Sequence, residues 1–491
     1  MKDLRIPPFA PVLLESMRAI GYSMETAVAD LVDNSISAGA RNVGIRFPAG
    51  RPTYLGILDD GQGMSFEELV SAMRHGSSNP LAPRDSDDLG RFGLGLKTAS
   101  LSQCRRLVVA SKKGGALNAV CWDLDYVTQK EDWLLQVLSE QDLTALPCMA
   151  DLKNQTTGTL VLWLTLDRAA ADDQGDGAIF GERMDAVRRH LALVFHRFIQ
   201  GPAGRLSLTI NDNPIRPIDP FLSGHASTQH HPEEKMWIHG SEVRVRAYTL
   251  PHINQLTRAE IEDAGGREDL RRQQGFYVYR NRRLIIWGTW FRLFKQEELT
   301  KLTRVAVDAS NDLDEHWTLD IKKSAAAPPE ALKQRLRALI PRMCQPSKHL
   351  HTFRGKKSFA GRVVPLWERI EPRQGSVEYR ISRSHGAVRA ILAMADDQTA
   401  RALSGLLRAI EETFPVEAFY NDRSQERIGY RAQSSLEPER REFLEQLAMN
   451  MLAAVESSAD GRTNLLDSLE FIEPFNQHPD FAQALKERLR K

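Results

Sequence analysis

The chain has 491 residues, of which 42% are hydrophobic and 26% charged, and its formal net charge is +1. This composition is ordinary for a globular protein, and the near-zero charge excludes a global polyelectrolyte field while leaving local basic patches open. No apolar run approaches the roughly 18 residues of a membrane-spanning helix, so we expect no membrane partner. The four cysteines show no CxxC spacing, which argues against a zinc site or disulfide framework and favours a cytoplasmic protein.

The length predicts about three domains. We place them at residues 1–200, 201–345 and 346–491. The last of them shows helical periodicity at residues 399–413, 437–455 and 480–489 but no catalytic motif, so its role stays open.

A short helix is expected at residues 13–20, and the stretch after it, residues 21–40, reads GYSMETAVADLVDNSISAGA. Its apolar residues recur at near-helical spacing, which predicts a helix. Asp30 and Asn34 lie four residues apart and therefore share one face. A carboxylate there can orient and deprotonate a water, and a neutral amide oxygen can join a Mg²⁺ shell. The alternative is a solvated helix surface.

Two strands are expected next, at residues 43–47 and 54–58, and the second delivers Asp59 at its end. The sequence from that residue is DDGQGM. Gly61 and Gly63 remove side chains where backbone passes close to a ligand, although a plain Asp-Gly turn would look the same. Ser65 and Glu68 form a capping box that opens a helix ending near residue 73.

A glycine-rich segment, GRFGLGLKT, follows a long polar loop at residues 76–88 that is typical of an active-site lid. Its glycines free backbone N–H groups to face phosphates, and Lys97 adds a cationic donor. The segment is not a Walker loop, because GxxxxGK[ST] is absent, and a flexible hinge is the alternative. Further strands are expected at residues 107–111, 119–123 and 159–164.

A helix at residues 181–200 is expected to end the first domain, and strands at 206–210, 235–250 and 275–286 to build the second. Thr159 is either an ordinary β-branched strand residue or a residue whose hydroxyl helps to form a binding pocket. Basic stretches such as 271–272, 280–283 and 356–357 are either phosphate contacts or solvated side chains.

The ordered boxes around Asp30, Asp59, Gly90–Thr98 and Gly158–Thr159 resemble the GHKL ATPase superfamily of gyrase, the heat-shock chaperone, histidine kinase and MutL. The nearest resemblance is to MORC-like and MutL-like members. It implies an α+β fold: a Bergerat-type ATP-binding sandwich of a mixed sheet covered by helices, a MutL-type transducer domain, and a mostly helical C-terminal region.

The resemblance also implies the roles of single residues. Asp30 would be the general base, in place of the glutamate of most members, and Asn34 the Mg²⁺ ligand. Asp59 would accept a hydrogen bond from the amino group of adenine. The remaining nucleotide-binding residues would be Gly61, Gly63, Met64, Gly90, Gly93, Leu94, Gly95, Lys97, Thr98 and Thr159. Lys323, with Lys322 as the alternate, would reach the γ-phosphate, unless both lysines are simply solvated.

The implied activity is slow, Mg²⁺-dependent ATP hydrolysis that drives a conformational switch. Binding of ATP would close the lid over the nucleotide and would bring two copies of the chain together as a homodimer. The implied client is double-stranded DNA, in a MORC/MutL-like or bacterial defence or restriction-associated system that could include a partner protein. The alternative is a protein-remodelling chaperone of the heat-shock type or a nucleotide-binding scaffold.

Overall fold

The structure is a computed structural model of the whole chain, in which two compact units, residues 1–352 and 353–491, are each described by themselves. The residues described are 3, 8–19, 21–48, 50, 53–74, 95–168, 177–201, 206–264, 266–297, 300–310, 318–319, 326–352, 364–370, 378–415, 419, 438–455 and 459–490. The expected lid at 76–88 and the candidate site residues Gly90, Gly93, Leu94, Lys322 and Lys323 lie outside this set. The division at residues 200 and 345 stays a prediction.

An eight-stranded mixed sheet forms the first part of the larger unit, in the order β5-β4-β3-β6-β2-β1-β7-β8. Its strands pair antiparallel except β1 with β7, which are parallel. The bounds are β1 Asn42–Arg46, β2 Tyr54–Asp59, β3 Arg106–Lys113, β4 Ala116–Asp123, β5 Gln136–Val137, β6 Gly158–Leu164, β7 Ser207–Ile210 and β8 Asn213–Pro214. Residues beyond 200 therefore add two strands to this sheet.

Helices cover both faces of this sheet because its strands alternate apolar side chains between two cores. In β2, Leu55 and Ile57 face a core shared with α1, α2, α4 and α8, whereas Leu58 faces a core shared with α6 and α7. The helices are α1 Ala10–Arg18, α2 Met24–Ser37, α3 Phe66–Met73, α4 Gly95–Leu101, α5 Leu124–Lys130, α6 Glu140–Thr144, α7 Met149–Asn154, α8 Ala178–Val194 and α9 His196–Gln200.

Capping side chains set where several helices begin. The side chain of Ser23 accepts from the backbone N–H of Thr26, so α2 begins at Met24, three residues after the predicted start. The capping box of Ser65 and Glu68 opens α3, as expected. The helix expected at 181–200 is instead two helices, separated at Phe195.

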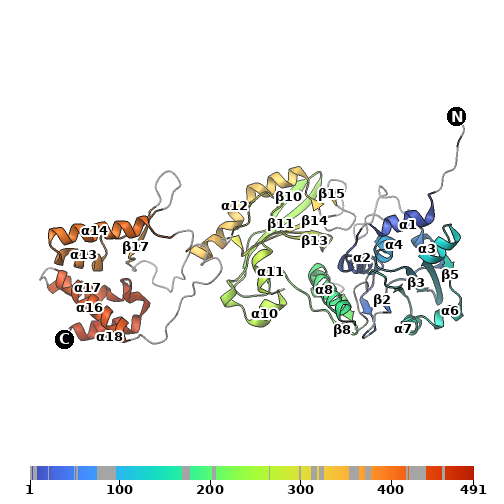
Figure 1. Cartoon of the computed structure of the whole chain (residues 1–491), viewed down its shortest axis with the longest axis horizontal. Helices are drawn as coiled ribbons and strands as arrows, with labels where there is room; N and C mark the ends of the chain where they lie inside the picture. The colour runs from blue at the N-terminus through green and yellow to red at the C-terminus, as the bar shows by residue number, and fades with distance from the viewer. Residues whose placement is uncertain are drawn as a thin grey trace. The chain divides into compact units, whose positions relative to one another are not determined.

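A second, six-stranded sheet completes this unit, in the order β10-β11-β14-β12-β13 with β9 paired to β11. The strands are β9 Gln229–His230, β10 Glu234–Ile238, β11 Ser241–Thr249, β12 Gly275–Arg280, β13 Arg283–Thr289 and β14 Thr303–Ala309. Helix α12, Glu330–Thr352, lies along this sheet (Figure 1) and packs Leu332, Leu336 and Ile340 against it. In chain order, α10 Arg258–Asp263 and α11 Arg267–Arg272 come between β11 and β12. The short strands β15 Thr318–Leu319 and β16 Ala326–Ala327 come between β14 and α12.

The unit of residues 353–491 is mostly helical, as expected. Its elements are β17 Trp367–Ile370, β18 Glu378–Ile381, α13 Gly386–Met394, α14 Asp397–Glu412, α16 Pro438–Ala454, α17 Ala459–Ser468 and α18 Pro479–Arg490. A core of its own, which includes Leu444, Met451 and Phe475, holds the helices together. Together with the mixed sheet flanked by helices, this confirms the expected fold class. None of the helices within the described ranges has the length and apolarity to cross a membrane.

Helices α8 and α9 join the two sheets of the larger unit. Buried His196 lies with its Nε2 3.3 Å from the hydroxyl of Tyr279 in β12. The next residue, Arg197, places its guanidinium 3.3 Å from the Tyr279 ring centroid and pairs with Asp308 of β14. Tyr279 and Leu284 belong to the same core as the first sheet. The two sheets are therefore joined by a packed interface.

Acid should weaken this interface. Burial lowers the pKa of His196 from its ordinary value of 6.5 to about 4. Between these values the unfolded chain binds the proton and the folded chain does not, so stability rises with pH across this window and is lost as pH falls through it. We expect the urea midpoint, followed by tryptophan fluorescence, to fall from pH 7 to pH 4. In His196→Gln that fall should be smaller, and an unchanged fall would contradict the assignment.

Candidate nucleotide-binding site

Asp59 is the last residue of β2, and its buried carboxylate accepts three hydrogen bonds. Its Oδ1 accepts from the backbone N–H of Gly61 at 2.9 Å and of Thr159 at 3.2 Å, and its Oδ2 accepts from the Ser35 hydroxyl at 2.9 Å. Burial raises the pKa of Asp59, and the three hydrogen bonds oppose that rise. The carboxylate is held in one orientation, and Oδ2 keeps capacity for a further donor.

Ser111, in the middle of β3, ties two of the predicted boxes together. Its hydroxyl accepts from the backbone N–H of Met64 at 2.8 Å and lies 2.9 Å from the hydroxyl of Thr159. It also donates toward the Gly158 carbonyl at 3.1 Å. Sequence reasoning missed Ser111 and Ser35. The available signal for Ser111 was a hydroxyl residue directly after the apolar run at residues 107–110 of this strand.

Two glycines of the boxes are required by packing. Gly63 has φ +67°, and a Cβ there would overlap the carbonyl oxygen of Lys112. At Gly158, with φ +150°, a Cβ would overlap the carbonyl oxygen of Asp59. The close approach that the sequence suggested is thus an approach of backbone to neighbouring strands.

Gly158→Ala should destabilise this domain. The methyl group would force β2 and β6 apart and strain a φ that L residues rarely adopt, which together cost about 3 kcal/mol. Thermal unfolding should show a lowered midpoint. The matched control is Gly181→Ala in α8, where a Cβ meets nothing within 4 Å, and it should be neutral or slightly stabilising. Equal midpoints for the two variants would contradict the packing argument.

Asp30 lies where α2 meets the start of α4. Its side chain is buried, and its Oδ2 accepts from the hydroxyl of Tyr22 at 3.2 Å. A Cβ on Gly95, the first residue of α4, would lie 3.4 Å from the same oxygen. Asn34, one helical turn further along, is exposed. The structure therefore brings together the predicted helix and the end of the glycine-rich segment, with a shielded carboxylate and an accessible amide.

Lys97 and Thr98 occupy the interior of α4. The ammonium of Lys97 donates to the carbonyl of Ala72 in α3 at 2.8 Å, and burial lowers the pKa of Lys97 to about 8. The hydroxyl of Thr98 is buried and has no hydrogen-bond partner within the described part of the chain. This hydroxyl could donate to an oxygen atom of a ligand.

The site also fits a hydrated divalent cation held chiefly by a ligand's phosphates. Among the residues that the structure describes, no three His, Cys, Asp or Glu side chains come together as a metal site. The exposed amide of Asn34 is the side chain that could supply one oxygen, which suits Mg²⁺ because this ion keeps several waters.

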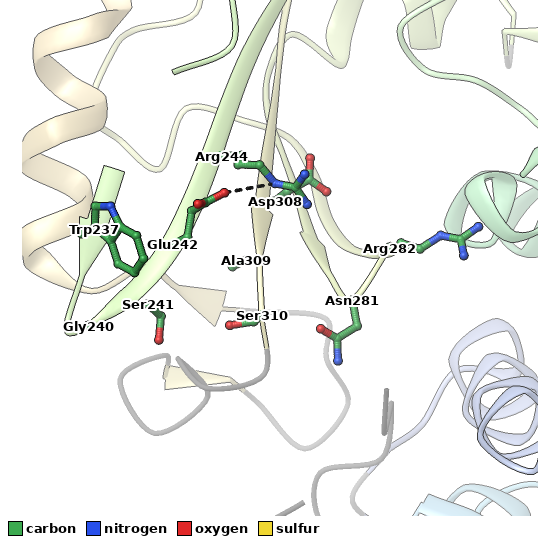
Figure 2. A pocket seen from close by; sticks show the side chains of 10 residues that line it. All are labelled: Trp237, Gly240, Ser241, Glu242, Arg244, Asn281, Arg282, Asp308, Ala309 and Ser310. Carbon is green, nitrogen blue, oxygen red and sulfur yellow. Dashed lines mark ion pairs between the residues drawn. The ribbon is translucent and has the colours of Figure 1, made fainter. Parts of the chain in front are cut away.

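A hollow of about 450 Å³ lies on the second sheet, and Figure 2 shows the side chains that line it. Its lining includes two carboxylates, Glu242 and Asp308, and two guanidinium groups, Arg244 and Arg282. Glu242 pairs with Arg244 at 3.9 Å, whereas Arg282 points away from both carboxylates (Figure 2). Asp308 is also paired with Arg197 from α9. The hollow therefore presents no excess charge to a ligand.

Among the arginines at residues 280–283, where the sequence suggested phosphate contacts, only Arg282 is exposed. Arg280 and Arg283 are 7% and 5% exposed. Arg282 lies over the Phe198 ring and donates to the Arg197 carbonyl at 2.8 Å. Arg282, between β12 and β13, therefore contacts α9.

Comparison with known proteins agrees with this geometry. Residues 22–159 match the family described as "Histidine kinase-, DNA gyrase B-, and HSP90-like ATPase". The chain is similar to ATPase morc-1 of Caenorhabditis elegans, 36% identical over 96 residues, which cover 19% of this chain and 11% of the relative. It is similar to the DNA mismatch repair proteins MutL of Thermosipho africanus, 32% identical over 93 residues (18% and 16%), and of Shewanella loihica, 35% identical over 107 residues (21% and 17%).

The family match covers strands and helices of the first sheet, and the part aligned with each of these relatives spans less than a fifth of that relative's length. Within that part fall the helix of Asp30 and Asn34, the turn after Asp59, and Thr159. The family match, the mixed sheet and the arrangement of these side chains agree. Over residues 22–159, the chain therefore matches the GHKL ATPase superfamily that its sequence boxes resemble.

Proposed function

We propose that this protein binds and slowly hydrolyses ATP with Mg²⁺ and uses the cycle as a conformational switch. The observation that carries the proposal is the placement of Asp30, a buried carboxylate next to the first residue of α4 and on the same helix as the exposed Asn34. The match of residues 22–159 to a family of ATPases supports it.

In this proposal each carboxylate has its own task. Asp59 accepts a hydrogen bond from the amino group of adenine, because its carboxylate is buried and a base without that donor would leave the acceptor unpaired. Asp30 orients a water and takes its proton, and Tyr22 keeps that carboxylate in place. Bound Mg²⁺ would neutralise phosphate charge, with the Asn34 amide among its ligands. Gly61, Gly63, Met64, Gly95, Lys97, Thr98 and Thr159 would surround the nucleotide, together with Gly90, Gly93 and Leu94; Lys323 or Lys322 would reach the γ-phosphate.

The rate should be low because aspartate is one methylene shorter than the glutamate usual in the superfamily. A general base displaced by about 1 Å can cost roughly a hundredfold in rate. Asp30 would then act through a backbone adjustment or a second water.

For the client we propose double-stranded DNA, with ATP closing a homodimer, in a MORC/MutL-like or bacterial defence system that could include a partner protein. The printed descriptions of the relatives, an ATPase and DNA mismatch repair proteins, support this choice. All four cysteines are free thiols, which suits a cytoplasmic protein.

The test is steady-state ATP hydrolysis by the full chain with Mg²⁺, with EDTA, and with duplex DNA at two salt concentrations. Mg²⁺-dependent turnover that DNA raises, more so at low salt, would support the whole proposal. Turnover indifferent to DNA would keep the ATPase and replace the DNA client by a protein. Absence of both turnover and ATP binding would overturn the proposal.

A further inference from the structure

A buried ion pair connects the helix of Asp30 to the second sheet. Asp33 lies on α2 between Asp30 and Asn34, and Arg283 is the first residue of β13. The Nε of Arg283 lies 3.2 Å from the Oδ1 of Asp33, and the two side chains are 7% and 2% exposed. Residues 250 positions apart in the chain therefore meet in the interior of the unit.

The guanidinium of Arg283 is fixed from several sides. Its Nη1 donates to the carbonyl of Leu284 at 2.7 Å, and its carbon lies 5.2 Å from the centroid of the Phe195 ring, at the break between α8 and α9. His190 of α8 contacts the Trp287 ring nearby, with centroids 5.7 Å apart. Burial and the charge of Arg283 lower the pKa of His190 to about 3, so this imidazole stays neutral near pH 7.

Such a pair contributes little net stability, since desolvating two charges offsets most of their attraction. What it does provide is a fixed register, because the pair forms only when both elements hold one relative position. Positions 30, 33 and 34 fall within about 100° of the helix circumference, so any rotation of α2 about its axis moves Asp33, Asp30 and Asn34 together.

We propose that Arg283 is a positioning residue for ATP hydrolysis, which acts through Asp33 to set the rotation of α2 and hence the aim of Asp30 and Asn34. The same contact makes the rate depend on the position of the second sheet, so a client that moves this sheet would regulate turnover. This inference rests on the proposed ATPase function and names the residue pair through which its site is controlled.

The experiment compares wild type, Arg283→Met, Arg283→Lys, Asp33→Asn and the Asp33→Asn/Arg283→Met double variant. For each we would measure kcat, the Kd of a non-hydrolysable ATP analogue, and the thermal midpoint. The matched control is Arg282→Met, which removes the neighbouring guanidinium that contacts Phe198 and the Arg197 carbonyl.

The inference predicts that Arg283→Met lowers kcat about tenfold or more while Kd changes less than threefold, and that Arg282→Met leaves kcat unchanged. Arg283→Lys should recover part of the rate, and the double variant should be no slower than the worse single variant, because both remove one interaction. If Arg283→Met does not fold, Arg283→Lys and Asp33→Asn carry the same test.

Wild-type turnover with unchanged kcat in the folded Arg283 and Asp33 variants would overturn this inference alone. It would also be overturned if the losses of kcat in the two single variants added up in the double variant. The same holds if the loss of kcat followed the fall in thermal midpoint across all variants, whether or not they alter Asp33 or Arg283. Wild-type chain without any turnover would instead overturn the proposed ATPase function, and this inference with it.

Discussion

Asp30→Asn should bind ATP with nearly wild-type affinity and hydrolyse it at least about a hundredfold more slowly. The amide is isosteric with the carboxylate and can still contact the Tyr22 hydroxyl, so the local packing is preserved. It cannot take a proton from water, and removing a general base costs about 10²–10⁴ in rate. The measurement is single-turnover ATP hydrolysis, with the Kd of ATP determined separately by calorimetry.

Two comparisons sharpen this result. Tyr22→Phe removes the hydroxyl that contacts Asp30 but keeps the acid, so its loss of rate should be clearly smaller than that of Asp30→Asn. Asp30→Glu restores the residue usual in the superfamily and should retain turnover. If Asp30→Asn hydrolysed ATP as fast as wild type, the assignment of Asp30 as general base would be wrong.

Asp59→Asn should lose the preference for adenine. The carboxylate can accept a hydrogen bond from the amino group of adenine, whereas the base of inosine triphosphate presents an acceptor oxygen at that position. Replacing one carboxylate oxygen by an NH₂ group favours the oxygen of hypoxanthine over the amino group of adenine. We expect ATP affinity to fall about tenfold or more, and the ratio of ATP to ITP affinity to fall further. Calorimetric titration with both nucleotides measures this ratio.

The control for that substitution is Ser35→Ala, which removes a hydrogen bond to Asp59 Oδ2 without touching the acceptor itself. It should weaken ATP binding slightly and leave the base preference unchanged. A ratio of ATP to ITP affinity that stays constant in folded Asp59→Asn would show that this carboxylate does not read the base. Circular dichroism would establish that the variant is folded.

Sequence reasoning could propose a candidate site because the signals it used are local. The spacing of Asp30 and Asn34, the turn after Asp59 and the capping box at Ser65 depend on residues within one helical turn or one loop. The same reasoning missed Ser35 and Ser111, because their hydroxyl groups form hydrogen bonds with residues of other elements that lie far away in the sequence. It also took Arg280 and Arg283 for surface groups, whereas the structure buries both.

By itself, therefore, the sequence predicted many of the elements in their order, the resemblance of the first part of the chain to an ATPase family and a set of candidate residues, since periodicity and turn chemistry act over a few residues. The tertiary structure decided how those residues are held. Thr159 reaches Asp59 across 100 positions, and Asp33 meets Arg283 across 250. Lys97, a candidate phosphate contact, donates to the Ala72 carbonyl, which the sequence did not predict. Such contacts depend on how separate elements pack, because a buried polar group takes whatever partner the fold brings within reach.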